Sequence, residues 1–137
     1  MNPILRNILA FIAAWVAGSI VNMGLIITGN SIFPLPEGTD PMDPASLAAA
    51  MEHFSTGNYI FPFLAHALGT LVGAFVVSKL AAGHQFKLAM GIAAFFLLGG
   101  VINAINLPAP LWFEALDLIV AYIPMGWLGW KMAGAKK

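Results

Sequence analysis

His66 lies within an apolar run, YIFPFLAHALGTLVGAFVVSKLAAG, that covers residues 59–83. About 20 apolar residues suffice to cross the hydrocarbon core of a bilayer as one helix. An ionisable side chain inside such a helix is a functional-site hypothesis by default. Imidazole titrates near neutral pH, so this side chain is suited to relaying protons or to binding a polar solute.

Polar side chains in three other apolar runs are predicted to reach the depth of His66. A helical rise of ~1.5 Å per residue places His66 roughly 10 Å from the start of its run. Asn22, Asn103 and Asp117 lie near the corresponding ends of their own runs. Glu114 is one helical turn from Asp117, on the same face. An ionised carboxylate facing lipid is strongly disfavoured, so we expect Asp117 to turn inward and to pair with His66.

The predicted binding site consists of His66, Asp117, Asn22, Asn103 and Glu114. Two interpretations stay open. The cluster either binds a proton, an ion or a small solute, or it holds the helices together through interhelical hydrogen bonds of ~0.6 kcal/mol each. The asparagines alone favour the structural interpretation, and Glu114 also suits a helix N-terminus, where the macrodipole stabilises an acid. A binding function requires His66 and Asp117 to line a water-accessible cavity.

Small residues form a second pattern on the segment that carries His66. Ala65, Gly69 and Gly73 recur at four-residue spacing. Small residues at this spacing let two helix backbones approach closely in lipid. The stripe is therefore predicted to be a helix-packing surface.

The composition favours a membrane protein. Of the 137 residues, 60% are hydrophobic and 9% are charged, whereas soluble domains average about 25% charged residues. A domain this small keeps much of its surface exposed, so the lipid bilayer must be the partner of most apolar side chains. Six scattered basic residues and zero net charge argue against nucleic acid as a partner.

The motifs of enzymes, cofactor sites and metal sites are not present in the sequence. It contains no HExxH pair, no Gly-rich phosphate loop, no nucleophile elbow and no cysteine. The acidic loop residues Asp40, Asp43 and Glu52, with His53, lack EF-hand or zinc spacing. We therefore expect no catalytic residue, no cofactor and no bound metal.

The elements that must position the polar residues are four membrane-spanning helices, predicted at about 4–28, 59–83, 86–107 and 111–132. Arg6 and the apolar residues after it resemble a signal peptide, but the run exceeds the 7–15 residues of a signal h-region, so we expect a retained helix. Residues 29–58 form a long loop that starts extended and ends in a short amphipathic helix, with Asp43 as its N-cap and Pro44 at its first position. Pro124 is predicted to kink the fourth span. The predicted fold is one all-α transmembrane domain, residues 1–137, built as a four-helix bundle.

The charges predict the orientation of this bundle. In the four-span layout, all basic residues fall on one side and all acidic residues fall at or toward the other. The positive-inside rule then places both termini in the cytoplasm and the long loop outside. The aromatic residues Tyr59, Trp112 and Phe113 are expected in an interfacial belt near that loop.

Two pairs of spans resemble each other. GSIVN at 18–22 matches GGVIN at 99–103, and FPFLAH at 61–66 lies against WFEALD at 112–117. This similarity suggests a parallel two-plus-two repeat of the kind some transporters use, although Ala- and Gly-rich helices also align by chance.

The segments FPFLAHALGTLVGA (61–74) and PAPLWFEALDLIVAYIPMGWLG (108–129), within the four-span layout, resemble small four-helix bacterial inner-membrane proteins. The resemblance implies a multi-pass protein of that membrane, and it implies no activity, cofactor or catalytic residue. We expect a small permease-like or ion- and proton-handling protein, whose outer polar site takes a small solute or ion. The alternative is a non-catalytic accessory or scaffold subunit. Partners in either case are a second copy of the chain or another membrane subunit.

Overall fold

Helices make up all the regular secondary structure of residues 1–136, which are the residues that the computed structural model describes. Four stretches of the chain are long and apolar enough to cross a membrane. Five of the six helices form these stretches, and the remaining short helix lies in the loop between the first two. Their bounds are α1 Pro3–Ile32, α2 Pro44–Met51, α3 Gly57–Leu80, α4 Gln85–Asn106, α5 Leu111–Val120 and α6 Ile123–Met132. The all-helical prediction is confirmed for this part of the chain.

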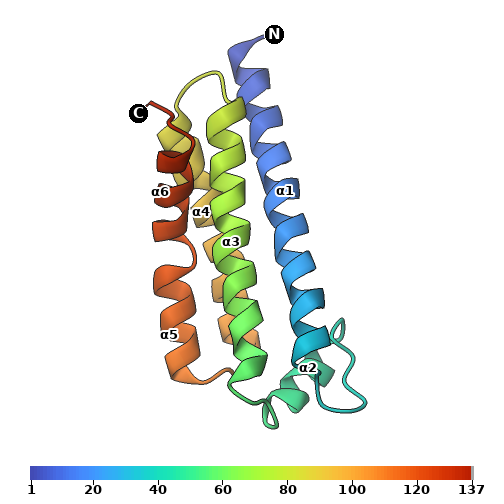
Figure 1. Cartoon of the computed structure of the whole chain (residues 1–137). Coiled ribbons are helices and arrows are strands. Elements are labelled where there is room, and N and C mark those ends of the chain that lie inside the picture. Colours follow the sequence, from blue (N-terminus) through green and yellow to red (C-terminus); the bar gives the residue numbers. More distant parts are fainter. Residues whose placement is uncertain (137) are drawn as a thin grey trace.

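Both chain termini lie at one end of the bundle, and α2 with its flanking loops lies at the other (Figure 1). The described basic residues gather at the terminal end, whereas the acidic residues lie in the loop around α2 and in the first two turns of α5. Lys137, the last basic residue of the predicted pattern, lies outside the described residues. The terminal end is tied by the Arg6 guanidinium, which donates to the Leu80 carbonyl at 2.7 Å.

Helices α1 and α3 pack with their backbones in close contact. A Cβ atom at Gly18 would lie 2.6 Å from the Gly69 carbonyl oxygen, and one at Gly69 would lie 2.9 Å from the Gly18 oxygen. A Cβ atom at Gly73 would meet the Ala14 carbonyl at 3.2 Å. Ala65 is fully buried on the same helix. The small-residue stripe of α3 therefore lies against α1 of the same chain.

The first helix is longer than predicted. It continues past Thr28 to Ile32, and its cap is the Phe33 amide, which donates to the Gly29 carbonyl at 2.7 Å. The expectation that Gly29 starts the loop is wrong because this glycine packs directly against the Phe61 ring of α3. A tertiary contact thus extends the helix where the local sequence favours a turn.

The loop between α1 and α3 contains the predicted short helix. The Asp43 side chain accepts from the Ala45 amide at 3.2 Å, and Pro44 occupies the first helical position, as predicted. Met51 of α2 is buried against Tyr59 and Phe113. Tyr59 and Phe113 thus form part of the core beneath α2, and their place in an interfacial belt stays a prediction.

The fourth span is two helices rather than one kinked helix. Ala121 and Tyr122 interrupt it, and Pro124 follows in the first turn of α6. Proline lacks an amide hydrogen and its ring clashes with the carbonyl four residues earlier, so a continuous helix cannot pass through this point undistorted. The break is visible in Figure 1 as the turn between α5 and α6.

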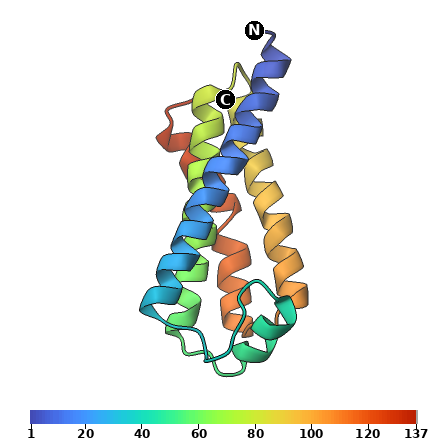
Figure 2. The same ribbon diagram turned by 90° about the vertical axis from the view of Figure 1, so that its right-hand side faces the viewer.

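Helices α1 and α4 diverge toward the α2 end, and the loop around α2 extends across that end (Figure 2). In the other half of the bundle they touch through Phe95, whose ring lies 6.2 Å from that of Phe11 and 6.0 Å from that of Trp15. The two-plus-two repeat stays a prediction.

Candidate functional site

His66 of α3 and Asp117 of α5 form the centre of the site. The imidazole Nδ1 lies 2.8 Å from Asp117 Oδ1 and 3.0 Å from Oδ2. The carboxylate side chain is 6% exposed and the imidazole 17% exposed, so the acid is the more deeply buried partner. This is the inward pairing that the cost of a lipid-facing carboxylate predicts.

The pairing with Asp117 leaves one imidazole nitrogen of His66 available. An ionised carboxylate accepts from Nδ1–H, which makes Nε2 the acceptor of a neutral ring. Within residues 1–136, no side chain or backbone group bonds to Nε2. The arrangement can therefore accept a proton or a hydrogen-bond donor at Nε2 while Asp117 stabilises the charge.

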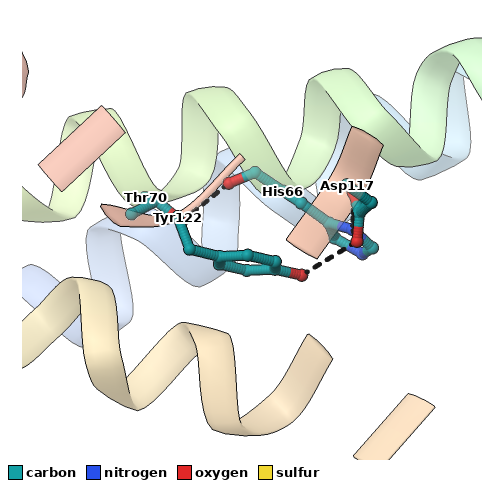
Figure 3. Close-up of polar contacts among 4 residues, drawn as sticks. All are labelled: His66, Thr70, Asp117 and Tyr122. Atoms are coloured by element: carbon teal, nitrogen blue, oxygen red, sulfur yellow. Dashed lines mark hydrogen bonds and ion pairs between the residues drawn. The ribbon is translucent and has the colours of Figure 1, made fainter. Parts of the chain in front are cut away.

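Tyr122 is a third member of the site that the sequence analysis does not predict. Its hydroxyl donates to Asp117 Oδ2 at 3.3 Å, and its ring stacks on the His66 ring with centroids 5.8 Å apart and planes inclined by 26° (Figure 3). In the same view, the Thr70 hydroxyl donates to the backbone carbonyl of His66 at 2.8 Å. Asp117 thus receives donors from two sides, and the imidazole is held by both an ion pair and a stacked ring.

Gly100 of α4 makes room for Tyr122. A Cβ atom at this position would lie 2.6 Å from Cζ of the phenol, and closer still to its hydroxyl. The next glycine along, Gly99, has open space around it. Of these two glycines, only Gly100 contacts the polar centre.

Two cavities meet at His66. The first, of about 190 Å³, lies beneath α2, and the second, of about 260 Å³, lies between α1, α3 and α4. His66, Gly100 and Asn103 line both of them. His66 therefore lies in the wall between the two spaces, and Asp117 faces only the first.

The other predicted residues distribute between these cavities. Asn22 lines the second, whereas Glu114 and Asp117 line the first. Asn103 lines both but makes no side-chain hydrogen bond to residues 1–136. The Asn22 side-chain oxygen is buried without a partner in the same part of the chain. All five predicted binding residues thus surround one region, although only His66 and Asp117 bond to each other.

The loop acids have local roles. Asp43 caps α2, and Asp40 accepts from the Met42 amide at 2.9 Å. In the described part of the chain, no three His, Asp or Glu side chains are close enough together to hold a metal ion.

Comparisons of the chain with protein-family models, curated proteins and solved structures found no match. The function of the chain is therefore inferred from the geometry around His66.

Proposed function

We propose that this chain is a small permease-like membrane protein that binds a proton, an ion or a small solute at the centre formed by His66, Asp117 and Tyr122. The observation that carries the proposal is the position of His66. Its Nδ1 is held by Asp117, yet the residue lines a cavity on either side. A group that only joined helices would need neither space.

The charge distribution supports a multi-pass orientation for the proposed protein. The basic residues of the terminal end would lie in the cytoplasm, and α2 with its acidic loop would lie outside. In this orientation the cavity beneath α2 is the outer one. The resemblance to bacterial inner-membrane proteins supports that membrane as the location.

The alternative is an accessory or scaffold subunit, and the mutual pairing of His66 with Asp117 favours it. Such a subunit needs a docking surface. The expected one, the stripe with Gly69 and Gly73, is covered by α1. A scaffold would have to dock through another face, so this alternative has less support than transport.

Proton flux into liposomes tests the proposal. The purified chain would be reconstituted with a pH-sensitive dye inside the vesicles, and a potential would be imposed across the membrane. We expect flux for the wild type and at least tenfold less for His66→Ala and for Asp117→Asn. His53→Ala is the matched control, because His53 is exposed in the loop outside both cavities.

If the transported species is a solute rather than a proton, the measured flux should depend on which solute is supplied outside the vesicles. Equal flux for the wild type, for both site variants and for empty vesicles would contradict the proposed function.

A further inference from the structure

We propose that the cavity beneath α2 binds a small organic cation, a primary ammonium carried on an apolar body of about one aromatic ring. The inference rests on the proposed function, since it names the class of solute taken by the same site. The walls, the charges and the size of the cavity each support it.

The walls of the cavity are mainly apolar. Leu47 and Met51 of α2 cover it from one side, and Phe54, Leu107 and Phe113 contribute further apolar surface. Ligand pockets of this kind bury an apolar body and use a few polar groups to fix its orientation. A fully hydrophilic solute would find polar groups on only part of this wall to replace its hydration.

The ionisable groups of the cavity are acidic, apart from His66. Glu114 and Asp117 both line it, and neither Lys nor Arg does. Asp117 is already paired with His66 and Tyr122. Glu114 is half-buried, and its carboxylate makes no hydrogen bond or ion pair with residues 1–136. A partly buried carboxylate without a cation is the complement of a ligand that brings one.

The size of the cavity limits the apolar body. Its volume of about 190 Å³ exceeds the ~150 Å³ of an engineered apolar cavity that takes benzene. One aromatic ring with a methylene-ammonium group therefore fits. The ammonium would lie against Glu114, and the ring would lie against the surface formed by Met51 and Phe113.

Binding of fluorinated ring compounds tests this assignment. The full-length chain in a nonionic detergent would be titrated with 4-fluorobenzylammonium, 4-fluorobenzyl alcohol and 4-fluorobenzoate, followed by ¹⁹F NMR against empty micelles. We expect saturable binding of the ammonium compound, at least tenfold weaker binding of the alcohol, and no binding of the benzoate. Similar binding of all three would show that the cavity only absorbs apolar rings, and no saturable binding of any would leave it without a ligand of this class. Either result overturns the proposal.

Two substitutions connect the binding to this cavity. Glu114→Gln should weaken binding of the ammonium compound about tenfold, the effect of one lost charge-assisted bond. Glu52→Gln is the matched control, because it removes an exposed acid next to α2 that lies outside the cavity. Equal weakening by both would show that only the net charge matters, which contradicts the proposal. Leu47→Trp fills the cavity without changing a charge and should also abolish binding, so the test does not depend on the folding of one variant.

The outcomes separate this inference from the proposed function. Binding of the ammonium compound without flux in liposomes would retain the cavity as a cation site and reject transport. Flux without such binding would retain transport and reject an organic cation as the solute.

Discussion

The Tyr122 ring occupies the space that a side chain at Gly100 would need, since a Cβ atom there would lie 2.6 Å from Cζ of the phenol. This contact joins α4 to the break between α5 and α6. It also fixes the hydroxyl at 3.3 Å from Asp117. The polar centre therefore depends on a glycine that makes no polar contact of its own.

Gly100→Ala should displace Tyr122 and destabilise the bundle by about 1–3 kcal/mol, the usual cost of overpacking a tight contact. Thermal or denaturant unfolding in detergent measures the loss. Gly99→Ala is the matched control, because nothing lies within 4 Å of a Cβ atom at that position. If both variants were as stable as the wild type, the close packing of Tyr122 on α4 would be refuted.

Tyr122→Phe removes the donor to Asp117 and keeps the ring that stacks on His66. We expect a loss of about 1 kcal/mol in the free energy of unfolding, typical of one hydrogen bond. Tyr59→Phe should change stability by less than about 0.5 kcal/mol, because the Tyr59 hydroxyl makes no hydrogen bond to any residue in 1–136. A larger effect at Tyr59 than at Tyr122 would contradict the assigned bond.

His66→Ala should destabilise the protein more than Asp117→Asn. The first change leaves a buried carboxylate with only Tyr122 as donor, and breaking a buried pair in this way costs about 3–5 kcal/mol. The second leaves a neutral imidazole beside a neutral amide. A double-mutant cycle should give a coupling energy above about 0.5 kcal/mol, the usual limit for independent sites.

The control cycle for that pair combines His66→Ala with Glu52→Gln. Glu52 is exposed next to α2 and lines neither cavity. Their coupling should stay within about 0.5 kcal/mol. Additive effects in the His66–Asp117 cycle would show that the ion pair contributes nothing specific.

Asn58→Ala should loosen the loop that covers the end of the bundle. The Asn58 amide donates to the carbonyls of Phe33 at 3.0 Å and Pro34 at 3.3 Å, which ties the start of the loop to α3. Loss of about 1 kcal/mol of hydrogen bonding should raise amide hydrogen exchange in residues 33–56 about fivefold. Asn106→Ala is the comparison, since its amide donates to the Ile102 carbonyl of its own helix. Unchanged exchange in the loop of Asn58→Ala would rule out this tie.

The positions of the four long apolar helices and the His66–Asp117 pair could be predicted, because the alternative placement of these residues has a large free-energy cost in each case. A run of apolar residues has one favourable environment, and a carboxylate inside it has few partners to choose from. The N-cap Asp43 was predictable for a local reason, as its side chain bonds two residues along the chain.

Tyr122 could not be predicted from spacing. In a continuous helix, residues 117 and 122 are separated by ~140° around the axis, so their side chains diverge. The interruption at Ala121 and Tyr122 returns the phenol to the side of Asp117. Pro124 signals a distortion, but the direction of the bend depends on what α4 offers, and Gly100 supplies that space. The end of α1 escaped prediction in the same way, since Phe61 decides it from another helix.

The interruption of the fourth span also gives the polar centre a mechanical role. Asp117 belongs to α5, whereas Tyr122 directly precedes α6. Their hydrogen bond therefore crosses the joint between two rigid segments. A ligand or proton that altered how Asp117 is bonded would therefore act directly on the contact between α5 and α6.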